Sequence, residues 1–436
     1  MDSTVRSGTE ALWAVLGGDP ALVDRVEYGG VSGLLPARLP VMDLARATVA
    51  VCGLAAVEQA RVAGPVRVDD GAVATAFVSE RHLRVDGRAP VSFAPLSRFW
   101  RAADGWVRTH ANYPHHRAAL LAALGVPDTA DSVGAVAEAI GGRKAVDVES
   151  VVYASGGLAV ALRTPREWAA HPQGREVAAR PVLSREVVDG AAPRRREGRP
   201  LRVLDLTRVI AGPVATRTLA LLGADVLRID PPGNPELPDQ HADTDVGKRT
   251  AALDLDRPSD RRTFGELLDA ADVLVTGYRP GALERYGLER PGLVTARLSA
   301  WGDYGPWGGR RGFDSLVQVA TGIAATEGSA RDPGALPAQA LDHGTGYLLA
   351  AAVLRSLTEQ RRDGGTRLVR LALAQTGHWL THELPAYDPE HHLTVSQGPL
   401  GRLRHAVSPV AYKGGPTGWA RPAGLQGGDS AAWVTG

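Results

Sequence analysis

The sequence of 436 residues contains a single cysteine and almost no excess of charge of either sign. Cys52 has no partner for an internal disulfide, which is typical of a reducing compartment. The formal net charge is +1, from 49 Lys and Arg against 48 Asp and Glu, so no global field attracts nucleic acid or an anionic membrane. The longest largely apolar run, residues 47–57, is much shorter than the roughly 20 residues that span a bilayer. No secretory signal is evident in the first residues, and we therefore expect a cytoplasmic protein with no nucleic-acid or membrane partner.

Length and composition predict a globular chain of two or three domains. Hydrophobic residues make up 44% and charged residues 22%, which is close to average usage in soluble proteins despite 51 Gly and 30 Pro. The small, charged, Pro- and Gly-bearing segment 186–200 indicates a linker. We expect residues 96–185 to form a small α+β domain before this linker and residues 201–380 to form an α/β domain after it. Residues 1–95 are expected to complete the larger domain, and residues 381–436 to form an extended tail.

Strands and helices alternate after the linker. The apolar pattern predicts strands at residues 201–206, 226–229, 251–255, 273–276 and 294–298. It predicts helices at residues 215–222, 259–271, 315–325 and 347–359. This alternation predicts a doubly wound, parallel, Rossmann-like α/β sheet beside the smaller α+β domain.

Residues 35–68 contain a weak echo of residues 336–369. Each segment holds Leu-Pro-Ala, an Asp, an Ala-rich helical run that reaches Glu-Gln, a Gly and a strand-like stretch. Chance similarity of Ala-rich helices is the alternative interpretation. If the echo is real, Asp43 in the first copy corresponds to Asp342 in the second, and we expect a structural role for Asp43.

The first strand and helix after the linker indicate a ligand site. The Gly212-Pro213 break would place a helix N-terminus at the carboxyl end of a strand, where anions bind favourably. However, the segment lacks Gly-x-Gly-x-x-Gly, and no phosphate-binding P-loop motif occurs in the sequence. The pattern alone therefore predicts a ligand-binding α/β domain without identifying the ligand.

Six successive segments resemble the motifs of family III CoA-transferases, the group of formyl-CoA transferase, carnitine CoA-transferase and α-methylacyl-CoA racemase. In family order they are residues 201–213, 222–233, 247–256, 271–287, 312–314 and 341–346. The resemblance implies an enzyme that moves CoA from an acyl-CoA thioester to a carboxylic acid, with CoA as a substrate and no permanently bound cofactor. It also implies a homodimer, possibly an interlocked one.

The resemblance also implies the site residues. Asp342 corresponds to the family's nucleophile, whose carboxylate attacks the thioester, gives a mixed anhydride and then carries CoA as an aspartyl thioester. Gly344 and Gly346 are expected to allow close backbone approach beside the developing oxyanion. The residues expected to contact CoA are Val209, Ile210, Ala211, Gly277, Tyr278, Arg285 and Arg311. The alternatives are a helix N-cap for Asp342, a core edge position for the tyrosine and solvated surface charges for the arginines.

Two departures from the family pattern bear on the reaction. Phe313 stands where racemase members carry a His that partners the Asp, so CoA transfer is favoured, and His343 is a weaker substitute. Segments that resemble the family's small domain, 100–107 and 164–168, come before the catalytic motifs. This order suggests a permuted chain or a truncated tandem duplication. An acyl-CoA isomerase or racemase, or a CoA-binding protein without activity, is the alternative function.

The histidine pairs do not predict a metal site. His378 and His382 have the i,i+4 spacing of two ligands on one helix face, but no Glu follows His378 and no third ligand is identifiable. The adjacent pairs at residues 115–116 and 391–392 are weaker still. We therefore expect no bound metal.

Overall fold

The computed structural model describes residues 3–31, 33–90, 93–194, 198–384 and 393–406, which belong to two units, residues 1–384 and 385–436. In the second unit the described part is a hairpin of β13 (Leu393–Gly398) and β14 (Gly401–Ala406), paired antiparallel. The histidine pair at residues 391–392 lies outside the described residues.

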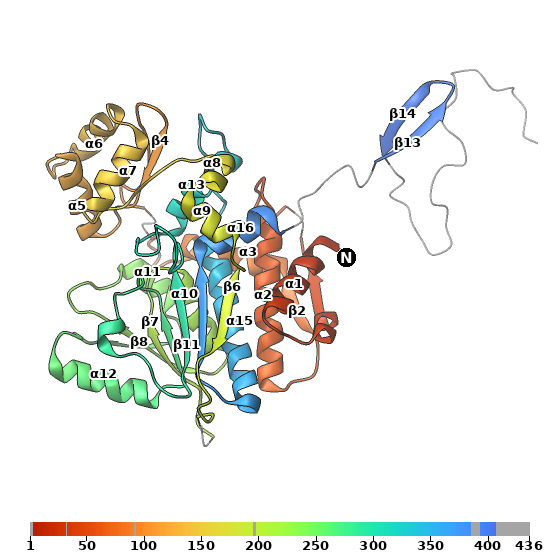
Figure 1. The fold of residues 1–436 in the computed structure, drawn as a ribbon, viewed down its shortest axis with the longest axis vertical. Helices are drawn as coiled ribbons and strands as arrows, with labels where there is room; N and C mark the ends of the chain where they lie inside the picture. Colours follow the sequence, from red (N-terminus) through yellow and green to blue (C-terminus); the bar gives the residue numbers. More distant parts are fainter. Residues whose placement is uncertain (1–2, 32, 91–92, 195–197, 385–392, 407–436) are drawn as a thin grey trace, which may run out of the picture. The chain divides into compact units, whose positions relative to one another are not determined.

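A seven-stranded sheet forms the centre of the first unit (Figure 1). Its order is β6 (Leu183–Val187), β12 (Arg367–Ala372), β11 (Val294–Ser299), β10 (Val273–Thr276), β7 (Arg202–Leu206), β8 (Asp225–Asp230) and β9 (Arg249–Ala252). All neighbouring strands are parallel except β6, which is antiparallel to β12. The chain runs outward from β7 to β9 and then continues on the other side from β10 to β12. This is the predicted doubly wound arrangement, and its order reverses between β7 and β10.

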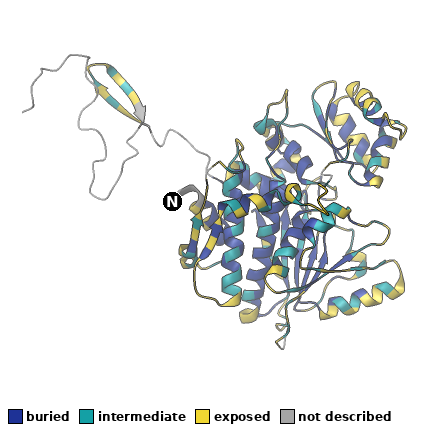
Figure 2. Cartoon of the chain, turned by 180° about the vertical axis from the view of Figure 1, so that it is seen from behind, coloured by how far each residue is buried: buried dark blue, intermediate teal, exposed yellow. Residues whose placement is uncertain are grey.

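The inner strands are apolar because helices cover both faces of the sheet. All four residues of β10 are buried. Along β7, Val203 joins the hydrophobic cluster that contains α10 (Ala211–Leu221) and α15 (Ala340–Asp363), whereas Leu204 joins the cluster of α12 (Pro258–Ala270). Alternate strand residues therefore pack against opposite layers. Figure 2 shows the sheet and central helices buried, while α12 exposes its outer side.

The N-terminal region extends the layer that contains α15. It comprises α1 (Ser3–Val15), a 3-10 helix (Pro20–Arg25), β1 (Val26–Gly29), α2 (Val41–Ala60), β2 (Val66–Asp69), α3 (Asp70–Phe77) and α4 (Ser79–His82). Strands β1 and β2 pair in parallel, and α2 packs along α15 (Figure 1). Glu327, which precedes α15, accepts hydrogen bonds from the backbone N–H groups of Arg38 and Leu39, which precede α2.

The echoed segments share local geometry. The capping residues Pro40 and Gln339 have φ/ψ of −76°/60° and −76°/62°, and Asp43 and Asp342 are each the third residue of their helices. Asp43 forms an ion pair at 3.2 Å with Arg46. This contact agrees with the structural role expected for Asp43.

A small antiparallel sheet and three helices form a separate hydrophobic core between Leu96 and Ala161. The elements are β3 (Phe99–Arg101), β4 (Trp106–Thr109), α5 (Pro114–Leu124), α6 (Ser132–Gly141), α7 (Ala145–Ala154) and β5 (Ala159–Ala161). The next elements are α8 (Pro165–Ala170), α9 (Pro172–Ala178) and β6. The expected domain boundary at residue 185 falls inside β6, which belongs to the large sheet because it pairs with β12.

Helix α15 begins at Ala340, seven positions before the predicted start. A helical Gly costs about 1 kcal/mol relative to Ala, which is why the sequence predicted a later start. The close packing of Gly344 and Gly346 against neighbouring helices outweighs this cost. The helix predicted at residues 315–325 is instead divided into α13 (Asp314–Ala320) and α14 (Ile323–Glu327) by Gly322, whose φ is +86°. The remaining helices are α11 (Pro238–Thr244), a 3-10 turn (Glu284–Tyr286) and α16 (Leu373–His382).

Candidate active site

Asp342 lies in the first turn of α15 and is 5% exposed. Its backbone N–H donates to Asp314 Oδ2 at 2.9 Å, and Gln318 Nε2 donates to Asp314 Oδ1 at 2.5 Å. The N-cap position is occupied by Gln339, so Asp342 is not the helix N-cap. The Asp342 side chain is therefore free of a capping role and lies among buried polar groups.

The surroundings of Asp342 favour its protonated form. Burial raises the pKa of Asp342 well above its usual range, and the nearby carboxylates of Asp314 and Glu80 raise it further. Burial also raises the pKa of Asp314 to about 6. For Glu80 burial acts in the same direction, but His343, whose Nε2 lies 3.8 Å from Glu80 Oε2, a backbone hydrogen bond and Arg81 together lower its pKa below the usual value. A nucleophilic role would require Asp342 to lose its proton when substrate arrives.

Asp342 lines two cavities at once. The first, of about 380 Å³, we call the N-terminal cavity because residues from 80–90 and residues 93–94 line one side of it. The second, of about 450 Å³, we call the arginine cavity. Tyr113, Val209, Phe313 and Asp342 line both cavities. The carboxylate therefore stands where the two spaces meet.

Two arginines of the arginine cavity lack carboxylate partners among the described residues. Arg279 and Arg311 form no ion pair within 4.0 Å in this part of the chain, and burial and then Arg279 lower the pKa of Arg311. Arg285 also lines the cavity, but it is 64% exposed and lies 3.0 Å from Asp256. An anionic ligand would provide the missing negative charge for Arg279 and Arg311. Arg279 was not predicted from the sequence, although it directly follows Tyr278 in the family motif.

The backbone before α10 is strained at Val209. Its φ is +68°, a left-handed value that costs a β-branched residue on the order of 1–3 kcal/mol. Glu236 holds this conformation by accepting a hydrogen bond from the Val209 N–H at 2.8 Å, and it also accepts one from the Tyr113 hydroxyl at 2.5 Å. Val209 and Ala211 line the arginine cavity, whereas Ile210 lines the N-terminal cavity. The same carboxylate thus links the small sheet region to the predicted CoA loop.

The predicted glycines and tyrosine differ in whether they line a cavity at Asp342. Gly277 and Tyr278 both line the arginine cavity. Gly344 and Gly346 line neither cavity. A Cβ at Gly344 would lie 2.7 Å from Leu44 Cδ2, and a Cβ at Gly346 would lie 2.6 Å from the Ala211 carbonyl oxygen. The structure therefore shows close helix packing at both positions, and their expected role beside an oxyanion stays a prediction.

Histidines from the small sheet region complete the site. The His110 ring stacks on Phe313 with centroids 3.8 Å apart and lines the N-terminal cavity. Burial, followed by the neighbouring His116 and Arg108, lowers the pKa of His110 to about 3, so the imidazole is neutral at physiological pH. His110 was not predicted from the sequence, because only the fold brings residue 110 to Phe313.

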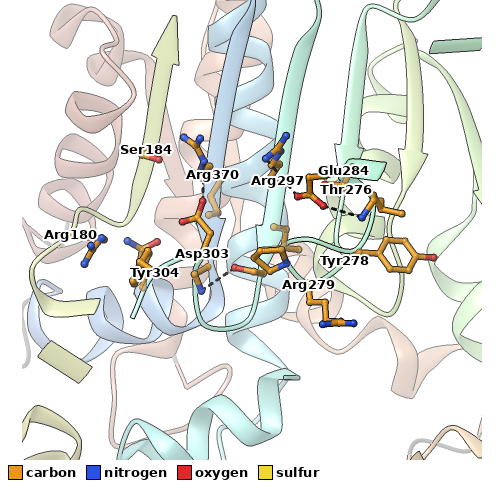
Figure 3. Close-up of a pocket in the computed structure, with 18 of the residues that line it drawn as sticks. Arg180, Ser184, Thr276, Tyr278, Arg279, Glu284, Arg297, Asp303, Tyr304 and Arg370 are labelled. Atoms are coloured by element: carbon orange, nitrogen blue, oxygen red, sulfur yellow. Dashed lines mark hydrogen bonds and ion pairs between the residues drawn. The ribbon is translucent and has the colours of Figure 1, made fainter. Parts of the chain in front are cut away.

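A third cavity, of about 310 Å³, lies beside the ends of β10, β11 and β12 (Figure 3). It contains Tyr278 and Arg279 but not Asp342. Three other arginines line it and have carboxylate oxygens at 2.5, 3.1 and 4.0 Å: Arg180 with Glu176, Arg370 with Glu186, and Arg297 with Glu284. These arginines are therefore already neutralised by the protein.

Neither a cluster of metal ligands nor a helix that could span a membrane occurs in the described part of the chain. No group of three or more His, Cys, Asp or Glu side chains in the described ranges is arranged to hold a metal ion. The His378 and His382 rings stack on each other with centroids 4.3 Å apart. No helix in those ranges is long and apolar enough to span a bilayer.

Comparison with known families identifies the C-terminal half. The sequence profile of CoA-transferase family III matches residues 199–412. The acetyl-coenzyme A transferase nodX of Hypoxylon pulicicidum is 35% identical over 205 residues, which cover 44% of this chain and 34% of that protein. A probable fatty acyl-CoA transferase of Mycobacterium tuberculosis, Rv3272, is 34% identical over 39% of this chain and 49% of its own length. The succinyl-CoA–L-malate CoA-transferase beta subunit of Chloroflexus aurantiacus is 32% identical over 43% and 52%.

The chain thus spans between about a third and a half of the length of these relatives. A crystal structure of Rv3272 is similar over 45% of this chain and 57% of that chain, with 32% identity and a TM-score of 0.39.

Proposed function

The chain belongs to CoA-transferase family III, and we propose that it transfers CoA from an acyl-CoA thioester to a carboxylic acid with Asp342 as the nucleophile. One observation carries this proposal. Asp342 is a buried carboxylate that lines both the arginine cavity and the N-terminal cavity. A CoA-transferase needs this junction, because the thioester carbon must lie between the CoA chain and the acyl group.

CoA would occupy the arginine cavity. Arg279 and Arg311 would bind its phosphates, because their planar guanidinium groups can each donate two hydrogen bonds and have no carboxylate partner in the described residues. Arg285 at the rim would contribute less because Asp256 already neutralises it. Val209, Ala211 and Gly277 would approach the CoA chain through their backbone atoms.

The proposed reaction passes through covalent intermediates on Asp342. Its ionised carboxylate attacks the thioester carbonyl, the C–S bond breaks, and a mixed anhydride and CoA thiolate form. The thiolate attacks the aspartyl carbonyl, which releases the first acid and leaves an aspartyl-CoA thioester. The acceptor carboxylate attacks this thioester, which releases the thiolate again and forms a mixed anhydride between the acceptor and Asp342. The thiolate then attacks the acceptor carbonyl, which gives the new acyl-CoA and restores Asp342.

An acyl-CoA isomerase is the second candidate, because one observation favours it. His110 is neutral, stacks on Phe313 and lines the same cavity as Asp342. A neutral imidazole and a protonated carboxyl group in one cavity could together remove and return an α-proton. Transfer remains the first proposal because Phe313 itself carries no proton to exchange.

Trapping of the intermediate tests the proposal. The protein is incubated with acyl-CoA and hydroxylamine, and peptide mass spectrometry is used to find a hydroxamate on Asp342. Asp342→Ala should abolish transfer and keep the fold, whereas Asp43→Asn, a change at the corresponding position of α2, should keep activity. Exchange of the α-proton in heavy water without the adduct would support isomerisation. CoA binding with neither signal would indicate a protein that only binds CoA.

The acyl donor, assembly and location need separate measurements. Two bacterial relatives are named for a fatty acyl donor and for the succinyl-CoA and L-malate pair, so a panel of donors and acceptors is required. We propose a homodimer, possibly an interlocked one, that acts in the cytoplasm. Light scattering after size exclusion and cell fractionation test these two points.

A further inference from the structure

Arg108 of β4 is a partly buried arginine without a carboxylate partner in the described ranges. Its guanidinium carbon lies 5.3 Å from the ring centroid of Phe93 and 4.8 Å from that of Phe99. No carboxylate of the described residues lies within 4.0 Å of the guanidinium, and its Nε is enclosed without a hydrogen-bond partner. Burial lowers the pKa of Arg108 only to about 10, so the group stays charged at neutral pH.

Two other partly buried arginines of the first unit are paired with carboxylates. Arg46 lies 2.6 Å from Asp70, and Arg163 lies 2.9 Å from Glu149. Both reside in the same unit as Arg108. An unpaired charge that is withdrawn from water is costly unless a ligand of opposite sign supplies the missing contacts. At Arg108 the protein supplies only the charge of Asp314, which raises the pKa of the guanidinium from beyond 4.0 Å, so an anionic ligand would supply the missing direct contact.

Arg108 faces a space that adjoins the nucleophile's cavity. It lines a cavity of about 590 Å³, and Arg81, Phe93, Ser315 and Gln339 line both this cavity and the N-terminal cavity. Gln339 is the residue that caps α15, and Asp342 lies in the first turn of that helix. The two cavities therefore adjoin along these four residues, and a ligand that spans both would have one end at Asp342 and the other at Arg108.

We propose that Arg108 binds a second, unreacting carboxylate, so that the acids exchanged at Asp342 are dicarboxylic acids. This inference rests on the proposed CoA transfer and names its substrate class. The guanidinium fork suits a carboxylate because two parallel hydrogen bonds can form. The phenylalanine rings lie against the guanidinium and do not compete for its N–H groups. Donor acyl group and acceptor acid occupy the same cavity in turn, so either can supply the second carboxylate.

Matched acids test this assignment. We compare glutarate with butyrate as acceptors, and glutaryl-CoA with butyryl-CoA as donors, in the wild type, Arg108→Met and Arg108→Lys. A charge-assisted hydrogen bond contributes about 1.5–3 kcal/mol, which corresponds to roughly 10–150-fold. Arg108→Met should lower kcat/KM for the dicarboxylic partner by this factor and leave the monocarboxylic partner unchanged. Arg108→Lys, which keeps the charge but not the fork, should restore part of the preference.

The control is Arg101→Met in the neighbouring strand β3, where the arginine is exposed over Trp106. It should leave both classes of acid unchanged. An equal loss for both classes in Arg108→Met, or a wild type that does not prefer the dicarboxylic partner, would overturn the assignment. If Arg108→Met affects glutaryl-CoA as the donor, the donor acyl group supplies the second carboxylate. If it affects glutarate as the acceptor, the acceptor acid supplies it.

A binding measurement separates this inference from the proposed function. In Asp342→Asn, which cannot turn over, calorimetry should still detect glutarate, and the added change Arg108→Met should weaken binding by the same factor. Glutarate binding that depends on Arg108 without any transfer by the wild type would refute CoA transfer and keep the anion site. Transfer that is indifferent to Arg108 would refute the anion site and keep CoA transfer.

Discussion

Removal of Arg279 or Arg311 should weaken CoA binding without weakening the fold. Both guanidinium groups line the arginine cavity without carboxylate partners in the described chain, and Arg279 contributes to the lowered pKa of Arg311. Each contact to a phosphate should contribute about 1.5–3 kcal/mol, so each Ala variant should raise KM for acyl-CoA roughly 10–150-fold. The free protein gains or keeps stability, because the mutual repulsion of two unpaired cations disappears.

The assay pairs kinetics with thermal unfolding. KM is measured for acyl-CoA and for the corresponding acyl-pantetheine, which lacks the phosphates, and Tm is measured with and without CoA. Both Ala variants should lose the stabilisation by CoA and resemble the wild type on acyl-pantetheine. Arg285→Ala is the control, because Asp256 already pairs with this exposed arginine, and its KM should change less than about 5-fold. An unchanged KM for acyl-CoA, or an equal loss on acyl-pantetheine, would refute phosphate binding by these two residues.

Two further predictions concern the first turns of α15. Gly346→Ala places its Cβ 2.6 Å from a backbone carbonyl oxygen of α10, so the free energy of unfolding, measured with denaturant, should fall by about 1–3 kcal/mol. The Cβ of Gly344→Ala meets only the end of a leucine side chain, so this variant should lose less. Equal losses in the two variants would contradict this packing argument. As the pH is lowered, the kcat/KM of the wild type should begin to fall well above pH 4, because Asp342 must be ionised to react and its pKa is raised. Glu80→Gln removes one neighbouring negative charge and should shift this fall to lower pH in a pH–rate profile, whereas an unshifted fall, or a fall at higher pH, would contradict the electrostatic role.

The sequence predicted the sheet better than the site. Strand β10 was expected at residues 273–276 and is found there, because a short apolar run that is buried on both faces is a strong local signal. The doubly wound order also followed from the alternation of strands and helices. The start of α15 was predicted too late, since the packing that permits glycine in a helix comes from α2 and α10, which are distant in the sequence.

The site residues also divide into those that the sequence predicted and those that it did not. Asp342, Val209 and Arg311 follow from motifs that lie within one half of the chain, and the structure places all three around the arginine cavity. Arg108 and His110 could not be predicted, because their significance depends on the small sheet region reaching Asp342 and Phe313. Nothing in the local pattern of β4 distinguishes these two residues from ordinary strand residues.

The pairing of α2 with α15 has a consequence for the order of folding. The hydrogen bond from the Leu39 N–H to Glu327 joins positions 288 residues apart, and α15 and α1 are the elements against which α2 packs most extensively. At about 5–20 residues per second, a ribosome adds those 288 residues in on the order of 15–60 s. Throughout that interval the apolar face of α2 lacks its main partner. The newly made N-terminal region is therefore a candidate for chaperone binding, and the N-terminal cavity is completed only after Asp342 has been added to the chain.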